Sequence, residues 1–127
     1  MTENEIAKII VDAAFKVHVA LGPGLLESVY QRALAYELQK RKLKVIIEDP
    51  ISVVYDGVNL GEGFRADIIV GDKVIIELKS VETIAKVHKK QLLTYLRLAD
   101  KGLGLLINFG APLIKHGITR VVNGLQE

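Results

Sequence analysis

The chain opens with two stretches in which apolar residues recur every three or four positions, the spacing that gathers them on one side of a helix. The first runs from about Glu3 to Leu21, and Gly22-Pro23-Gly24 ends it because proline cannot continue a helical hydrogen-bond ladder. The second runs from about Leu25 to Arg41 and ends in basic residues, which suit the negative end of the helix dipole. The pattern predicts two helices joined by a tight turn.

From Leu43 onward the apolar positions form short runs rich in β-branched residues, a pattern typical of strands. These runs predict strands at residues 44–48, 52–55, 58–60, 64–70, 74–79, 103–109 and 118–122. Asp56-Gly57 predicts a hairpin turn, and Ile84–Ala99 a third helix. The runs at 64–70 and 74–79 carry apolar residues in both alternating sets, which indicates a sheet covered on both faces.

This order of elements predicts an α/β fold in which a central mixed sheet is flanked by helices. We expect a single domain over residues 1–127, since no linker, repeat or low-complexity segment divides a chain of this ordinary domain length. A domain of this size buries about two-thirds of the surface of its unfolded chain, so it needs no covalent cross-link to fold.

The composition excludes some kinds of chemistry and indicates the cellular compartment. The chain has no cysteine, which excludes disulfides, thiolate metal sites and thiol nucleophiles and fits a reducing compartment. The N-terminal segment lacks the basic and apolar regions of a signal peptide, and no apolar run approaches the roughly 20 residues that span a bilayer. We therefore expect a cytoplasmic protein with no membrane partner. The net charge of +2 is too small to indicate nucleic-acid binding by itself.

Three charged residues stand out in the strands at 64–70 and 74–79. Glu77 and Lys79 are two apart, so they share one face of their strand, and Asp67 can lie opposite Glu77 on the preceding strand. Two adjacent carboxylates favour a hard cation, Mg²⁺ or Mn²⁺, that would also bind a phosphate, and Lys79 could hold or help deprotonate a water. The spacing alone favours ordinary solvated charges, but emergence from a buried Val-Ile-Ile run favours a functional role.

The length of the turn between these two strands decides whether such a site forms. A two-residue turn at Gly71-Asp72 would pair Asp67 with Ile76 and place the Asp67 side chain on the wrong face. A three-residue turn at residues 71–73, or a bulge, pairs Asp67 with Glu77. We predict the second arrangement, because glycine or aspartate can supply the left-handed backbone that such a turn needs.

Two of the predicted helices carry further candidates. Glu27 and Tyr30 are three apart and so neighbours on one helix face, although the helix dipole alone explains an acid in a first turn. His88, Gln91 and Tyr95 can line one stripe of the third helix and offer hydrogen-bonding groups to a substrate. A solvated glutamine, a half-buried tyrosine and a structural histidine are the ordinary interpretation of the same stripe.

Read together, these stretches resemble a known family. Gly24, Glu27 and Tyr30 spell the signature of the GxxExxY protein family, and the resemblance continues in order through four later stretches: Phe64-Arg-Ala-Asp67, Ile75-Ile-Glu77-Leu-Lys79, Gln91-Leu-Leu-Thr-Tyr95-Leu and Leu105-Leu-Ile-Asn108-Phe109-Gly110. That family is similar to a compact branch of the PD-(D/E)xK nuclease-like superfamily. The resemblance implies a restriction-endonuclease-like fold with catalytic acids on a strand pair.

The resemblance also implies which residues form the site. They match the superfamily's two acids and lysine, the helical acid of the RecB-like and lambda-exonuclease-like branches, and the Q-x-x-x-Y motif: Asp67, Glu77, Lys79, Glu27, Gln91 and Tyr95. One departure is Ala66, which stands where the superfamily name has proline, a residue with no chemical role.

Two hypotheses of function follow. The first is a Mg²⁺- or Mn²⁺-dependent nuclease that hydrolyses DNA or RNA, with Asp67, Glu77 and Glu27 as metal ligands, directly or through water. Lys79 would position the nucleophile, and the glutamine and tyrosine of the third helix would orient the substrate or Lys79. The alternative is a non-catalytic module that keeps the nuclease fold and binds nucleic acid or protein, a role in which the acid–acid–lysine set would serve no purpose.

Substrate contacts outside the metal site are expected from the basic residues of the third helix. Lys86, Lys89 and Lys90 lie close to Gln91 in sequence and could contact the phosphate backbone, although a solvated helix face is nearly as good an explanation. The chain has no room for a separate recognition domain, so a homo-oligomer or a protein partner could supply specificity.

Overall fold

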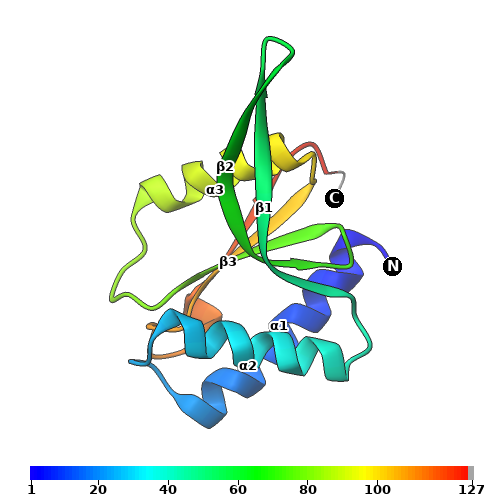
Figure 1. Ribbon diagram of the computed structural model, residues 1–127. Coiled ribbons are helices and arrows are strands. Elements are labelled where there is room, and N and C mark those ends of the chain that lie inside the picture. Colours follow the sequence, from blue (N-terminus) through cyan, green and yellow to red (C-terminus); the bar gives the residue numbers. More distant parts are fainter. Residues whose placement is uncertain (126–127) are drawn as a thin grey trace.

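A computed structural model describes residues 1–125 and has the predicted α/β architecture (Figure 1). Within these residues, three α-helices, one short 3₁₀ helix and five strands follow one another in this order: α1 (Glu3–Leu21), α2 (Glu27–Lys40), β1 (Val45–Tyr55), β2 (Val58–Val70), β3 (Val74–Lys79), α3 (Lys86–Ala99), β4 (Leu103–Asn108), η1 (Ile114–His116) and β5 (Ile118–Val122). The strands form one sheet in sequence order, in which only the β3–β4 pair is parallel. The prediction of a central mixed sheet is confirmed.

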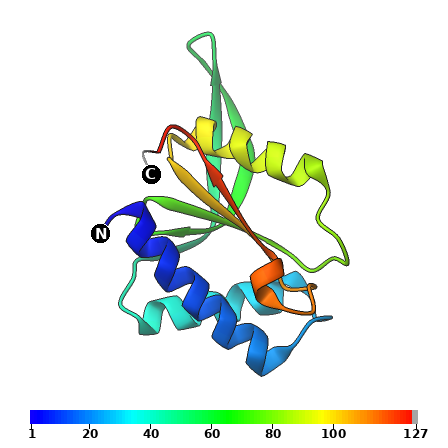
Figure 2. The same cartoon turned by 180° about the vertical axis from the view of Figure 1, so that it is seen from behind.

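Helices cover both faces of the sheet. In Figures 1 and 2, α1 and α2 lie below the sheet and α3 lies above it. The lower core joins α1 and α2 to side chains such as Ile68, Ile76 and Leu78, whereas the upper core joins Leu92 and Leu96 of α3 to the opposite strand face. Strands β3 and β4 are therefore apolar on both sides, as their sequence indicates.

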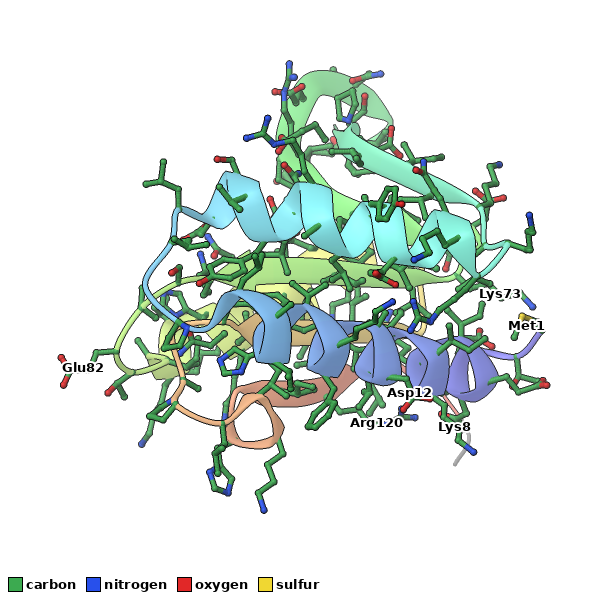
Figure 3. All side chains as sticks on the ribbon, turned by 90° about the horizontal axis from the view of Figure 1, so that it is seen from below. Met1, Lys8, Asp12, Lys73, Glu82 and Arg120 are labelled. Carbon is green, nitrogen blue, oxygen red and sulfur yellow. The ribbon has the colours of Figure 1, made fainter. Side chains whose placement is uncertain are left out.

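The two lower helices lie side by side across the sheet, as Figure 3 shows from below. Met1 and Lys73 meet at one end of the molecule, where the Lys73 Nζ donates to the Met1 carbonyl at 2.6 Å, and Glu82 marks the opposite end. Within residues 1–125, no helix combines the length and hydropathy needed to cross a bilayer.

Strands β1 and β2 are longer than the sequence pattern predicts. Residues 44–48 and 52–55 are two predicted strands but one observed strand, and the glycines at 61 and 63 do not interrupt β2. Pro50 is accommodated because β1 is an edge strand, where a missing backbone donor costs no ladder bond on the open side. The two strands project beyond the rest of the sheet as a long arm that ends at Asp56-Gly57 (Figure 1).

The turn between β2 and β3 has the predicted odd length. Val70 pairs with Val74, so the turn consists of the three residues 71–73. Gly71 and Asp72 both have left-handed backbones, with φ of 60° and 58°. Continuing this register beyond Ile68 and Ile76 places Asp67 level with Glu77. The predicted three-residue turn is confirmed, together with its register as far as the pair Ile68–Ile76.

Helices α2 and α3 each begin two residues later than the apolar pattern predicts, and hydrogen bonds explain both differences. The Leu25 amide donates to the Tyr30 hydroxyl at 3.1 Å, and the Leu25 carbonyl accepts from the Ser80 Oγ at 2.7 Å, so Leu25 is held outside α2. At the start of α3, the Ala85 amide donates to the His88 Nδ1 at 3.2 Å. His88 thus caps its own helix and is not free to line a site.

Candidate active site

The predicted acids lie where strand β3 separates from strand β2. The β2–β3 ladder ends at the pair Ile68–Ile76, after which β2 continues into the arm with β1. Strand β3 instead continues beside β4, with Glu77 level with Leu106. Asp67 and Glu77 are the first residues past the end of the shared ladder, and we call this pair the acidic fork.

Side chains replace the missing ladder bonds around Asp67. Its Oδ2 accepts a hydrogen bond from the Leu78 amide at 2.8 Å, and its own amide makes a long bond of 3.4 Å to the Glu77 Oε1. Its carbonyl accepts from the Gln31 Nε2 of α2 at 3.0 Å. Asp67 is therefore fixed by contacts with two separate elements, β3 and α2.

Burial raises the pKa of both carboxyl groups of the acidic fork. Desolvation, followed by the charge of Asp67 and a hydrogen bond with it, raises the pKa of Glu77 to about 9. Desolvation also raises the pKa of Asp67, and the Leu78 amide bond partly opposes that shift. Lys79 favours the charged form of both groups but does not outweigh burial. A cation is the ligand that would allow both groups to ionise.

Lys79 lies two residues beyond Glu77 and is half-buried at the end of β3. Among the described residues it forms no ion pair within 4 Å, so its ammonium group is not committed to a carboxylate of the chain. Its backbone is held in place instead: its carbonyl accepts from the Phe109 amide at 2.9 Å. The strand end is fixed while the charged group remains available.

Glu27 begins α2 and is exposed. The bond from Ser80 to the carbonyl of Leu25 ties this helix start to the residue that follows Lys79. Glu27 also lies one helical turn before Gln31, the residue that contacts Asp67. In residues 1–125, no hydrogen bond or ion pair joins Glu27 to the acidic fork, so its role as a ligand stays a prediction.

Tyr95 belongs to the surroundings of the acidic fork. Its ring stacks on Phe64 of β2, with centroids 3.9 Å apart and planes 4° apart. Burial and then the charges of Glu77 and Asp67 raise its pKa, while a hydrogen bond with Gln91 lowers it. The structure thus brings the tyrosine and the glutamine of α3 toward the two acids, and Gln91 itself is exposed.

The three lysines of α3 do not share this position. Lys86, Lys89 and Lys90 are all exposed. Lys89 lines a hollow of about 360 Å³ with His116 and Thr119, on the side of α3 toward η1 and β5, whereas Tyr95 faces β2. A phosphate contact of these lysines stays a prediction, and one made by Lys89 would lie on the flank of α3 toward η1 and β5.

Two further residues, which the sequence did not indicate as site residues, lie beside the acidic fork: Gln31 and Glu48. Gln31 donates from one nitrogen both to the Asp67 carbonyl and to the Glu48 Oε1, at 3.0 and 2.8 Å. Glu48 is exposed on β1, and its charge raises the pKa of Asp67. The only sequence signal for Glu48 is an acid at the end of a Val-Ile-Ile run, the same signal that marks Glu77.

Other polar residues in or near the candidate motifs have structural roles. The buried Tyr30 hydroxyl donates to the Gly22 carbonyl at 2.5 Å, and its ring stacks on Phe109 with centroids 4.5 Å apart. The His18 Nε2 donates to the Ala111 carbonyl at 2.8 Å. Asn108 binds both backbone groups of Val81 and so fixes the segment after Lys79.

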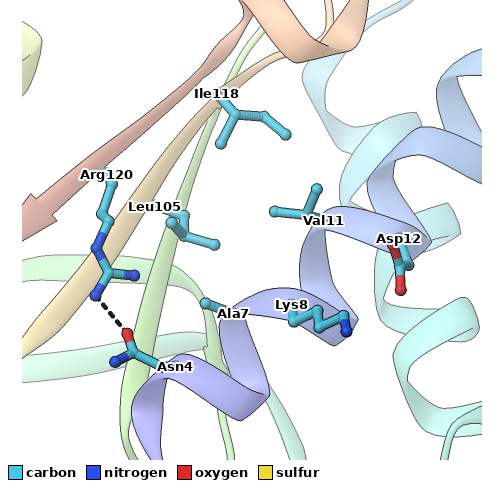
Figure 4. Close-up of a pocket in the computed structure, with 8 residues that line it drawn as sticks. All are labelled: Asn4, Ala7, Lys8, Val11, Asp12, Leu105, Ile118 and Arg120. Carbon is cyan, nitrogen blue, oxygen red and sulfur yellow. Dashed lines mark hydrogen bonds between the residues drawn. The ribbon is translucent and has the colours of Figure 1, made fainter. Parts of the chain in front are cut away.

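A separate hollow of about 460 Å³ lies between α1 and strands β4 and β5 (Figure 4). Its floor is apolar, with Ala7, Val11, Leu105 and Ile118, and polar side chains lie at its rim. One rim contact is a hydrogen bond from Arg120 to Asn4. The hollow contains no pair of carboxylates comparable to the acidic fork.

Comparison with protein families decides the classification. Residues 4–121 match the PD-(D/E)XK nuclease superfamily, which is nearly the whole chain. The chain belongs to the PD-(D/E)XK nuclease superfamily. No curated protein and no solved structure gives a significant match. The assignment of Asp67, Glu77 and Lys79 to the acid, acid and lysine of the superfamily name stays a prediction. Ala66, which precedes Asp67, is fully buried in the upper core.

Proposed function

We propose that this superfamily member is a divalent-metal-dependent nuclease that hydrolyses phosphodiester bonds of DNA or RNA. One observation carries the proposal: two partly buried carboxyl groups, Asp67 and Glu77, lie together at the acidic fork, and burial raises the pKa of both. Such a pair destabilises the fold unless a proton or a cation lies between its oxygens. The superfamily and the neighbouring Lys79 make a metal–phosphate site the best explanation.

The donors present fit Mg²⁺ or Mn²⁺. Both cations prefer hard oxygen ligands, and Mg²⁺ in phosphate-processing sites is commonly bound by one or two carboxylates together with substrate oxygens. Within residues 1–125, no group of three or more histidine, aspartate or glutamate side chains is placed to hold a metal ion, so the proposed site rests on the two carboxylates of the acidic fork. Asp67 and Glu77 would hold the ion, and Glu27 would join directly or through water.

A bound divalent ion would supply Lewis acidity toward a phosphate oxygen and a lowered pKa for a bound water. Lys79 forms no ion pair among the described residues and lies two residues from Glu77, on the same face of β3. Its ammonium group would position the attacking water and shield negative charge on the phosphate. Gln91 and Tyr95 would orient the substrate or Lys79 from α3, since Tyr95 responds electrostatically to both acids. Lys86, Lys89 and Lys90 would contact phosphates of the nucleic acid away from the cleaved bond.

We further propose that the chain belongs to the GxxExxY branch of the superfamily, as its motif residues have separable roles. Gly24 has φ of 104°, a conformation that other residues rarely adopt. Tyr30 closes the turn through its hydroxyl. Both ends of the motif therefore hold the helix start in place, and the central Glu27 is left exposed for chemistry.

A cleavage assay tests the proposed function. Single- and double-stranded DNA and RNA would be incubated with the protein in EDTA, Mg²⁺ or Mn²⁺, and wild type would be compared with Glu77→Gln. Glu82→Gln is the matched control, because Glu82 is an exposed acid just beyond β3 at one end of the molecule (Figure 3). We expect metal-dependent cleavage by wild type and Glu82→Gln only. Tight nucleic-acid binding without cleavage under any metal condition would favour the non-catalytic module instead.

A further inference from the structure

Both strands of the arm change the face they present to the core at one level, the level of Asp67. In β2, Ala66 belongs to the upper core and Ile68 to the lower core, although alternation places residues two apart on the same face. In β1, the upper core contains both Ile46 and Ile51, an odd separation that alternation also forbids. The regular sheet is interrupted on both strands at this level.

Glu48 is the β1 residue at the interruption. The register on either side, Ile47 with Ile68 and Asp49 with Ala66, places Glu48 directly opposite Asp67. Its backbone has φ of 55°, in the left-handed region that residues with a side chain rarely adopt within a strand. Such a conformation persists only where the surrounding structure imposes it.

The side chain of Gln31 joins the two interrupted strands. Its Nε2 has two protons, and the structure gives it two acceptors: the Glu48 carboxylate at 2.8 Å and the Asp67 carbonyl at 3.0 Å. Both donors are used, so the amide is held in one orientation. Gln31 lies in the second turn of α2, and Tyr30 fixes the start of this helix, so the contact comes from a rigid element.

We propose that Gln31, anchored by Glu48, is a positioning residue that holds Asp67 in the geometry required for metal binding. The proposal rests on the proposed function. The Asp67 carbonyl receives its bond from a side chain, so removing Gln31 frees the one segment of β2 that carries a metal ligand. The same contact fixes the helix of Glu27 against Asp67, since Glu27 and Gln31 are one turn apart. A helix–strand contact of this kind would preorganise ligands from two elements.

Mn²⁺ binding, measured by electron paramagnetic resonance at fixed pH, tests the proposal without relying on turnover. Gln31→Ala removes the side-chain donor. Gln31→Glu keeps the shape of the side chain, but its carboxylate cannot donate to the Glu48 carboxylate or to the Asp67 carbonyl. Gln39→Ala is the matched control, an exposed glutamine on the same helix. Loss of a partner that orients a ligand typically weakens metal binding or activity by about 10–100-fold. We expect a loss in that range for both Gln31 variants and none for Gln39→Ala.

Glu48 variants separate positioning from general support of the fold. Glu48→Gln keeps an acceptor oxygen for Gln31, whereas Glu48→Ala removes it. We expect Glu48→Ala to weaken Mn²⁺ binding and lower kcat more than it raises KM, and Glu48→Gln to recover most of both losses. A purely structural contact would lower the melting temperature of the alanine variants but leave the Mn²⁺ affinity of the folded fraction unchanged.

The outcomes distinguish this proposal from the proposed function. Wild type that binds Mn²⁺ and cleaves nucleic acid, with Gln31→Ala and Gln31→Glu indistinguishable from Gln39→Ala, would overturn the positioning role alone. Wild type that neither binds Mn²⁺ nor cleaves would overturn both. Should Gln31→Ala not fold, Gln31→Glu and the Glu48→Ala and Glu48→Gln pair carry the same comparison.

Discussion

Two regions at the same end of strand β3 differ in the partners that their buried polar groups have. Around Tyr30 and Phe109, which we call the aromatic knot, each buried polar atom has a neutral partner: the Tyr30 hydroxyl binds Gly22 and Leu25, and His18 binds Ala111. At the acidic fork, Asp67 and Glu77 instead meet each other, and burial opposes the charge of both. The first arrangement stabilises the fold by itself, whereas the second needs a proton or a cation between its two carboxyl groups.

The contrast separates structural motif residues from chemical ones. A group whose bonds are all satisfied within the chain has nothing to offer a substrate, however prominent it is in a motif. Groups that perturb one another and remain partly accessible are the usual components of active sites. By this criterion Tyr30 supports the fold, whereas the acidic fork and Lys79 are the groups that we propose for the chemistry.

The largest effect on stability is expected from the aromatic knot. Tyr30→Ala should lower the free energy of unfolding by about 3–5 kcal/mol, the range for removing a large buried ring. Tyr30→Phe should cost about 1–2 kcal/mol, because the Gly22 carbonyl and the Leu25 amide lose their partner. Urea unfolding measures both, with Tyr36→Ala as control, since Tyr36 is on the same helix and 60% exposed. Equal losses for Tyr30→Ala and Tyr36→Ala would contradict the assignment.

Lys79 should show the reverse behaviour, a large loss of activity with little loss of stability. Lys79→Ala is expected to lower cleavage by at least about 10²–10³-fold, as loss of one stabilising charge at a reacting centre typically does. Its unfolding free energy should change by no more than about 0.5 kcal/mol, because the side chain has no partner to lose among the described residues. A variant that unfolds outright would mark Lys79 as structural, and one that cleaves normally would end its catalytic role.

The acidic fork should make the metal-free protein less stable as pH rises. The unfolded chain releases the Glu77 proton near pH 4.5, whereas the folded chain keeps it until about pH 9. Between these values the folded state holds more protons, so stability falls with increasing pH. Glu77→Gln should therefore gain about 1–2 kcal/mol at pH 8 in EDTA, allowing for solvent screening, and should flatten the pH dependence.

Thermal melts from pH 5 to 8.5 in EDTA test this sign, with Glu82→Gln as the control for loss of an exposed acid. Melting temperatures of wild type and Glu77→Gln that change with pH in parallel would refute the burial of a protonated Glu77 at the acidic fork. Addition of Mg²⁺ should raise the melting temperature of wild type at pH 8 and leave Glu77→Gln unchanged, because only the wild type gains by binding.

The smallest effect concerns the exposed lysines of α3. Replacing Lys86, Lys89 and Lys90 by glutamine should weaken nucleic-acid binding and reduce the salt slope by roughly 0.7–0.9 for each lost phosphate contact. Binding measured at several salt concentrations provides the slope. No change would assign these lysines to an ordinary solvated helix face, in keeping with the position of Lys89 on the flank away from Tyr95.

Much of this arrangement follows from local sequence rules. Helix positions, the order of strands and the odd turn at 71–73 are local properties, so periodicity and the backbone preference of Gly71 predict them. The same rules fail in the arm, where they divide each strand into two. Pro50 and the glycines of β2 are ordinary strand breakers, and only the edge position of β1 and the long pairing with β2 override them.

The roles of Gln31 and Glu48 could not be predicted from the sequence because they depend on contacts between distant elements. Gln31 reaches across 36 positions to Asp67, and nothing in its own helix distinguishes it from Gln39. Glu48 is marked by the run that precedes it, but a proline follows two residues later and suggests that the strand simply ends. Tertiary packing decides these cases.

The most direct test of the central claim is a crystal structure of wild type grown with Mn²⁺ and measured at the manganese absorption edge. The account predicts one anomalous peak between the Asp67 and Glu77 carboxylates, within about 2.0–2.3 Å of an oxygen of each, and no such peak in Glu77→Gln. Well-ordered Asp67 and Glu77 side chains with no peak between them at millimolar Mn²⁺ would contradict a metal site at the acidic fork.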